Sequence, residues 1–202
     1  MQKRVQLSGE SADPRAIRAR DRIGLALVEL SREKRYDDIT VQDIAQRAQV
    51  SRTTFYAHFQ DREGIMLRYC VVFGEYLGRQ LRWDREAGQY RFPLASLFAH
   101  MLDIRSLYEA LSRARRTDDL LKIFRINLAT WFEKRIEAAR RKAVASRGSH
   151  VLNGATNVPG PLLAQHIAGT VVQLLAWWME HHCPSEPQAM DEHFHRLIVG
   201  LR

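Results

Sequence analysis

The stretch from Ser51 to Phe59 (SRTTFYAHF) places small hydroxyl residues and one arginine ahead of two aromatic residues and a histidine. An arginine can donate two parallel hydrogen bonds to guanine O6 and N7, and a threonine can bond a base edge or pack its methyl group on thymine. Tyrosine and histidine side chains can reach phosphate oxygens. We therefore expect base contacts from Arg52, Thr53 and Thr54, and phosphate contacts from Tyr56 and His58.

Two short helices are needed to present these side chains. Thr40 is a good cap for a helix from Val41 to about Ala48, and Asp43 can answer it in a weak capping box. After a three-residue connection, Ser51 can cap the second helix, which is the plan of a helix-turn-helix. The apolar residues placed to hold these helices together are Ile44, Val50 and Phe55.

A simpler alternative is that the aromatic residues only cover a hydrophobic core. We expect that role for Phe55 and Phe59. For the whole set, the caps, the spacing, the arginine and the phosphate donors all agree with contact to DNA.

Helical periodicity also covers most of the remaining chain, so the sequence predicts an all-α fold. Asp13 and Pro14 suit the start of a helix that runs to about Arg35. The other expected helices cover residues 62–82, 93–102, 104–113, 118–146, 161–182 and about 190–201. The expected organisation is a flexible arm (1–13), a three-helix domain that holds the helix-turn-helix (14–60) and a larger helical domain (61–202), with helix 62–82 connecting the two.

Composition limits the classes of protein that fit. With 202 residues and 46% hydrophobic residues, the chain can bury a sizeable core. The net charge of +8 is spread over the chain, with an excess of three positive charges in residues 1–70 and five in residues 71–202. Cys70 and Cys183 follow no ligand spacing, which favours free thiols in a reducing, cytoplasmic setting.

Several functions are not expected from the sequence. The N-terminus lacks the apolar core of a signal peptide, and the longest apolar run, Ile167 to Met179, contains Gln173 and is too short to span a bilayer. No glycine-rich phosphate loop, G-x-S-x-G or H-E-x-x-H motif is present, so we do not expect an enzyme or a cofactor.

Residues 40–67 (TVQDIAQRAQVSRTTFYAHFQDREGIML) resemble the DNA-binding domain of the TetR family of bacterial transcriptional regulators. The resemblance rests on the helix-turn-helix, on YAHF at residues 56–59 and on the DREGI helix start. It implies that Gln42 can also reach a base edge, that Thr40 contacts phosphate, and that Arg62, which stands where lysine is usual, contacts DNA. Two residues depart from the family pattern: Gln49 at a turn position where glycine is common, and Ile65 in place of leucine.

The family resemblance also implies that residues 61–202 form an effector-binding and dimerisation domain, and the sequence supports a homodimer independently. The segment from Gly160 to His182 is apolar on more than one side, so it needs two partners, one of which can be a second copy. Two helix-turn-helix domains related by a two-fold axis would bind a palindromic operator in double-stranded DNA. The residues expected at the interface are Ile167, Val171, Leu174, Leu175, Trp178, Phe194, Leu197 and Leu201.

A small organic effector is the other expected partner. Aromatic and polar residues recur on apolar helix faces, which suits a ligand pocket, although most such residues are ordinary core. The candidates are Tyr69, Phe73, Phe98, Met101, Phe124, Asn127, Trp131, Gln173 and Trp177. Asn127 and Gln173 rank above the others because a buried amide needs a partner.

Alternatives remain open at this stage. The histidines at residues 181, 182, 193 and 195 suggest a metal site, but His193 and His195 would point to nearly opposite sides of a helix, so solvated or interface histidines are favoured and no metal is expected. Repression is favoured because a bound dimer needs only to occupy a promoter. Activation by the same fold, or a helical ligand-binding protein without DNA activity, are the alternatives.

Overall fold

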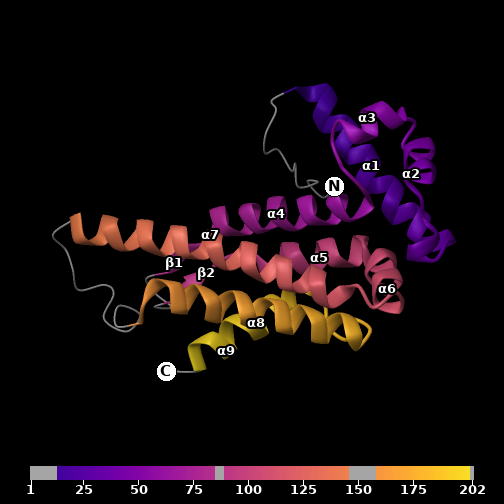
Figure 1. Cartoon of the computed structure of the whole chain (residues 1–202). Helices are drawn as coiled ribbons and strands as arrows, with labels where there is room; N and C mark the ends of the chain where they lie inside the picture. The colour runs from indigo at the N-terminus through magenta and orange to yellow at the C-terminus, as the bar shows by residue number, and fades with distance from the viewer. Residues whose placement is uncertain (1–12, 85–88, 146–157, 201–202) are drawn as a thin grey trace. The chain divides into compact units, whose positions relative to one another are not determined.

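The computed structural model describes residues 13–84, 89–145 and 158–200 (Figure 1). The predicted all-α fold is confirmed over these residues, which form nine α-helices and a 3-10 helix, η1 (Tyr36–Asp38). The helices are α1 (Pro14–Glu33), α2 (Val41–Arg47), α3 (Arg52–Tyr56), α4 (Arg62–Gln80), α5 (Leu94–Asp103), α6 (Arg105–Arg113), α7 (Thr117–Ala145), α8 (Gly160–Glu180) and α9 (Pro187–Gly200).

A short hairpin follows α4, where the sequence predicted only a connection. Strand β1 (Arg82–Asp84) pairs antiparallel with β2 (Gln89–Arg91), and Trp83 lies opposite Tyr90 in the register. Aromatic residues favour such pairing, and the segment carries one in each strand. The predicted arm, apart from Asp13, and residues 146–157 lie outside the described residues.

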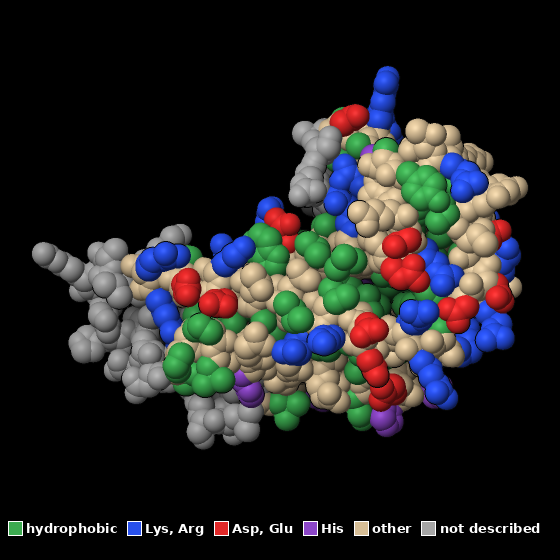
Figure 2. All heavy atoms as spheres, viewed as in Figure 1, with side chains coloured by type: hydrophobic (Ala, Val, Ile, Leu, Met, Phe, Trp, Pro, Cys, Tyr) green, Lys and Arg blue, Asp and Glu red, His purple; other side chains and the backbone are tan. Residues whose placement is uncertain are grey.

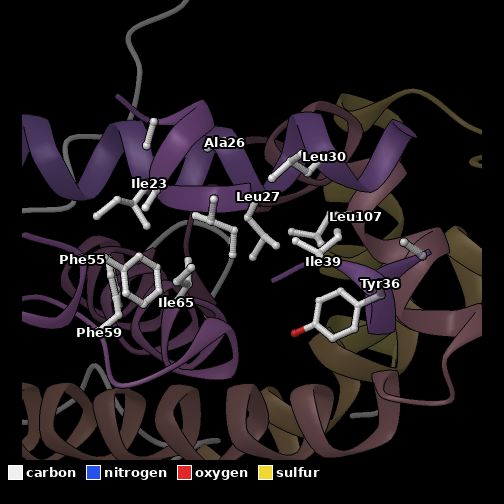
Figure 3. Packing of buried hydrophobic residues seen from close by; sticks show 14 of the residues in the cluster. Ile23, Ala26, Leu27, Leu30, Tyr36, Ile39, Phe55, Phe59, Ile65 and Leu107 are labelled. Atoms are coloured by element: carbon white, nitrogen blue, oxygen red, sulfur yellow. The ribbon is translucent and has the colours of Figure 1, made fainter. Parts of the chain in front are cut away.

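The chain divides into two compact units. The first comprises, as far as it is described, residues 13–73 and 103–120. Its core joins Ile23 and Leu27 of α1 to Phe55 of α3 and Ile65 of α4 (Figure 3). Leu107 of α6 belongs to the same cluster, so α6 packs with the helix-turn-helix although it is distant in sequence. A domain ending at residue 60 stays a prediction; by its packing this unit also takes in the first part of α4.

The second unit comprises residues 74–102 and, as far as they are described, 121–200. Asp191 of α9 caps the start of α5, because its Oδ1 accepts from the Leu94 N–H (2.8 Å) and the Ala95 N–H (3.3 Å). Phe98 of α5 packs edge-on against the fully buried Trp178 of α8, with 4.9 Å between ring centroids. These contacts tie α5, α8 and α9 together around one core.

Two glycines of α4 face α7 within this second unit, and one of them, Gly78, is needed for the close approach of the two helices. A Cβ atom built on Gly78 would lie 2.5 Å from the Trp131 Cβ, closer than real Cβ atoms come. One turn earlier, a Cβ on Gly74 would have its nearest neighbour, the Leu128 backbone nitrogen, at an ordinary 3.6 Å. The two positions therefore differ in what a methyl group would meet, although both lie in the same helix.

We expect Gly78→Ala to lower the free energy of unfolding by about 1–2 kcal/mol, because the steric clash of the new methyl group with the Trp131 Cβ outweighs the gain in helix propensity. Gly74→Ala is the matched control and should raise the free energy of unfolding by about 0.5–1 kcal/mol. Urea denaturation of both variants checks the pair. Equal effects of the same sign would show that α4 and α7 do not approach each other at Gly78.

Helix α8 is longer than the apolar run seen in the sequence. By length and composition alone it passes as a membrane span, with a mean hydropathy of 1.2, so the prediction that it is too short is corrected. Half of its apolar 18-residue window is buried inside the protein.

Candidate nucleic-acid interface

The helix-turn-helix begins with a complete capping box. The Thr40 hydroxyl accepts from the Asp43 N–H (3.1 Å), and the Asp43 carboxylate accepts from the Thr40 N–H (2.9 Å) and hydroxyl (2.8 Å). Hydrogen bonds from Lys34 and Thr40 lower the pKa of Asp43 to about 2, so this carboxylate is charged at neutral pH. The Thr40 hydroxyl, expected to contact phosphate, is thus already engaged in the cap.

The turn between α2 and α3 holds Gln49 in the left-handed region, with φ of 53°. Glycine is common at this turn position in the family pattern, and a left-handed backbone conformation is one that favours glycine. Val50 N–H donates to Ala45 O (3.0 Å) and closes the end of α2. The Ser51 hydroxyl then accepts from the Thr54 N–H (3.0 Å) and caps α3.

The first turn of α3 presents the residues expected to read bases. Arg52 and Thr53 are exposed, and no contact of the Arg52 guanidinium with the rest of the described chain is found. Thr54 is half-buried, and its hydroxyl lies 2.8 Å from the Ser51 hydroxyl, so it is partly used within the helix. Gln42 is exposed near the start of α2, and Tyr56 at the end of α3 is 50% exposed.

His58 lies beside two arginines that sequence reasoning missed. Burial, followed by the positive charges of Arg20 and Arg68, lowers the pKa of His58 below its usual value of 6.5. Arg20 of α1 and Arg68 of α4 also line one small hollow together with Phe59. They are distant from the motif in sequence, and only the packing of α1 on α4 brings them next to it.

The Arg62 side chain, which was predicted to contact DNA, makes its contacts within the protein. Its Nη1 donates to Tyr36 O (2.6 Å) and Ile39 O (3.0 Å), and its guanidinium lies over the Tyr36 ring, 4.5 Å from the centroid. Nε donates to Glu63 (3.0 Å), and the side chain is only 18% exposed. The Arg62 fork therefore braces η1 against α4 instead of extending into solvent.

Ion pairs link α1 and the residue after it to α2. Arg47 donates to both carboxylate oxygens of Glu33 (2.8 and 2.6 Å), and Lys34 pairs with Asp43 at 2.8 Å. The hydrogen bond from Arg47 is the main cause that lowers the pKa of Glu33. On the face drawn in Figure 2, Lys and Arg side chains are interspersed with Asp and Glu and do not form one basic patch.

The predicted effector residues fall in both units. Tyr69 packs on the core of the first unit, and its hydroxyl lies over Gly24 of α1. Phe73 is the last residue of the first segment of that unit. Gln173 and Trp177 are exposed on α8, so the expectation that the Gln173 amide is buried is wrong. The residues that remain in the second unit are Phe98, Met101 and Phe124, which are buried, and Asn127 and Trp131, which are half-buried.

The half-buried amide of Asn127 has a partner within its own helix. Its Nδ2 donates to Ile123 O at 2.9 Å. The need for a partner, which ranked Asn127 among the effector residues, is therefore met without a ligand. Trp131 has a neighbour as well, since the Lys134 ammonium lies 5.0 Å from its ring centroid.

Most of the predicted interface residues face the core of their own unit. Those that are buried there are Ile167, Val171, Leu175, Trp178 and Phe194. Leu174 is half-buried, Leu197 is 55% exposed, and Leu201 lies outside the described residues. Periodicity correctly showed a helix with two apolar sides but did not tell which side the protomer covers.

The outer side of α8 carries a shallow hollow instead. Gln165, His166, Thr170, Gln173 and Trp177 line it, together with Gly169 and Leu174. A Cβ on Gly169 would meet nothing within 4 Å. Small residues at 169 and 170 leave room for a second helix to approach closely.

The C-terminal histidines divide into exposed and buried ones. His181, His182 and His193 are exposed, and His181 stacks on Trp177 with 4.8 Å between centroids. His195 is 3% exposed, so the expectation of a solvated or interface histidine is wrong for this residue. No group of three or more His, Cys, Asp or Glu side chains that could hold a metal occurs in the described parts of the chain.

The comparisons with known proteins agree with this geometry. Residues 25–69 match the family model described as bacterial regulatory proteins, tetR family. The fold resembles the dihydroxyacetone kinase operon activator DhaS (TM-score 0.64, 16% identity, 91% of this chain and 95% of that one). It also resembles the fatty acid degradation regulator FadR from Bacillus halodurans (TM-score 0.56, 16% identity, 89% and 97%).

A third similar structure is a chain from Syntrophomonas wolfei assigned to the TetR-family transcriptional regulators (TM-score 0.54, 20% identity, 90% and 94%). No curated protein matches the sequence significantly. The N-terminal helix-turn-helix segment, residues 25–69, therefore matches the TetR family of bacterial regulatory proteins, and the helical fold of the chain resembles that of TetR-family structures.

Proposed function

We propose that the protein is a homodimeric repressor that binds a palindromic operator and is released by a small-molecule effector. The observation that carries this proposal is the exposed first turn of α3, where Arg52 and Thr53 stand outside the packing of the first unit. An arginine kept out of intramolecular contacts at this position is available to fork onto guanine. Gln42 and Tyr56 are exposed on the flanks and supply further base and phosphate contacts.

The phosphate contacts are assigned partly to new residues. Because the Arg62 guanidinium is occupied by the η1 carbonyls, the positive charge beside His58 comes from Arg20 and Arg68 instead. Both arginines are proposed to face the DNA backbone that His58 approaches. The helix-turn-helix is thus used as in the family, with a different distribution of cations around it.

The dimer is proposed to form through the outer side of α8, which the protomer leaves uncovered. Leu162 is 60% exposed and Trp177 is 42% exposed on this helix, and Leu197 is 55% exposed on α9. Exposed apolar side chains of this size next to small residues suit a close contact between helices of two copies. This assigns the interface to residues that differ from most of those expected from periodicity.

We expect Trp177→Glu to raise the dissociation constant of the dimer roughly 30-fold, because a central tryptophan at an interface contributes about 2 kcal/mol or more. Sedimentation velocity over a concentration series checks the result. Leu25→Glu is the control, since Leu25 of α1 is similarly exposed, at 44%, and should leave the dimer intact. An unchanged dimer in Trp177→Glu would move the interface away from this side of α8.

A pH dependence follows from the lowered pKa of His58. A nearby phosphate favours the protonated ring and raises this pKa in the complex, so DNA binding takes up a proton. Affinity should therefore rise as the pH falls below about 6.5 and be flat above about 7.5. Fluorescence anisotropy at constant ionic strength measures it, and His58→Gln should flatten the curve. A curve of unchanged slope in that variant would remove His58 from the interface.

The proposal is tested by the binding of purified protein to duplexes from the DNA that flanks its own gene. Shifted complexes that resist competitor DNA and disappear in an Arg52→Ala, Tyr56→Ala variant with intact helicity support it. Activation remains the second candidate, because the dihydroxyacetone kinase operon activator has the same fold. Transcription from the bound promoter in the presence and absence of the protein separates the two.

A further inference from the structure

His195 on α9 carries a polar atom that the fold leaves unsatisfied. Its side chain is 4% exposed, and its Nε2 has no hydrogen-bond partner, the single such case among the buried side-chain nitrogen and oxygen atoms of the described residues. Burying a hydrogen-bonding group without a partner costs free energy, so such atoms are rare and point to a missing partner.

The other ring nitrogen fixes both the orientation and the tautomer of His195. Nδ1 lies 2.8 Å from the Asp191 carbonyl oxygen. A carbonyl oxygen only accepts hydrogen bonds, so Nδ1 carries the proton, and in the neutral ring Nε2 is then an acceptor. Asp191 is itself held in place because its carboxylate caps α5. In this tautomer of the neutral ring, the partner that Nε2 lacks is a donor, such as a hydroxyl or an N–H group.

The surroundings of the ring are aromatic. Phe92 and Phe194 meet it edge-on, with centroids 5.9 and 5.3 Å away, and Phe132 lies behind Phe92 at 4.8 Å. All three phenylalanines are almost completely buried. Walls of this kind favour an apolar or aromatic body in the molecule that brings the donor.

We propose that His195 is the polar anchor of a small-molecule site whose ligand carries one hydroxyl or N–H donor on an aromatic body, as phenol does. The two hollows described above lie elsewhere, one along α8 and one between α1 and α4, so the proposal requires the phenylalanine cluster to open for the ligand. A metal is not the partner, since no group of three possible ligands occurs among the described residues.

The role of this ligand as an effector rests on the proposed function. The existence of the binding site at His195 does not depend on it. The site also differs from the pocket expected from the sequence, which did not include His195. The new signal is an unsatisfied atom, which becomes visible only when the burial and the partners of each side chain are known.

The test uses the full-length protein with phenol and anisole as probes. The two have the same aromatic ring, but anisole has a methyl ether in place of the hydroxyl donor. Protein labelled with 15N-histidine reports on Nε2 of His195 directly. We expect phenol to shift the Nε2 resonance of His195 and to bind roughly tenfold more tightly than anisole, as the loss of one hydrogen bond implies.

Variants of two histidines on α9 complete the test. His195→Phe keeps an aromatic ring of similar size and should bind both probes equally, whereas His193→Phe, at an exposed position two residues away, should keep the preference for phenol. Equal binding of the probes to the unaltered protein, no binding of either, or a preference that survives in His195→Phe would overturn the proposal. So would an Nε2 resonance that shows a bound water and does not respond to phenol.

Failure here is distinguishable from failure of the proposed function. Operator binding is measured without any probe and does not involve α9 directly. Specific DNA binding without a phenol preference would leave the regulator intact and remove the site. A phenol preference without specific DNA binding would do the reverse.

Discussion

Replacement of Arg52 by alanine is expected to weaken operator binding roughly 5- to 150-fold for each half-site, since a bidentate contact to guanine contributes about 1–3 kcal/mol. The free energy of unfolding should stay within about 0.5 kcal/mol of that of the unaltered protein, because Arg52 is exposed. Anisotropy with operator and scrambled duplexes at one salt concentration measures the loss.

Two variants separate base reading from charge. Arg52→Lys keeps the positive charge but loses the planar fork, so it should keep non-specific affinity and lose most of the discrimination between duplexes. Arg22→Ala removes an exposed arginine from α1 and should change neither value by much. If Arg52→Ala weakened both duplexes equally, Arg52 would be a phosphate contact and the reading residues would have to lie elsewhere.

Replacement of Arg62 by alanine is expected to lower the free energy of unfolding by about 2–4 kcal/mol. The variant loses two charged hydrogen bonds to the carbonyls of Tyr36 and Ile39, both 2% exposed, and the guanidinium over the Tyr36 ring. Arg62→Lys should lose about half as much, because a single ammonium cannot reproduce the fork. Chemical denaturation measures the series, with Arg22→Ala as the control.

The opposite result would restore the role that the family resemblance implies. If Arg62→Ala were as stable as the unaltered protein and lowered the salt dependence of DNA binding by about one phosphate contact, Arg62 would bind the DNA backbone. The two outcomes involve different measurements, so both can be read from the same set of variants.

Local sequence signals predicted the helix-turn-helix well. Thr40, Asp43 and Ser51 act through neighbours three residues away, and the left-handed position of Gln49 follows from the length of the turn. Such contacts depend only on nearby residues, so the sequence contains nearly all the information needed. The same holds for the placement of the long helices, whose apolar periodicity extends over many turns.

Assignments that depend on distant packing were less successful. Ile167 and Trp177 both lie on the apolar helix α8, but the first is buried by its own unit and the second is exposed. Which side is covered depends on α5 and α9, and no local pattern records it. Arg62 illustrates the same limit, because its partners, Tyr36 and Ile39, lie more than twenty residues away.

The central claim is that an exposed α3 in each of two copies reads a palindrome. It is tested most directly by selecting bound duplexes from a random pool with the purified protein at one stated salt concentration. The account predicts enrichment of two inverted half-sites with a fixed spacing of about one helical turn, and loss of this enrichment in Arg52→Ala. A pool without enrichment above non-specific binding, or a consensus without inverted symmetry, would contradict it.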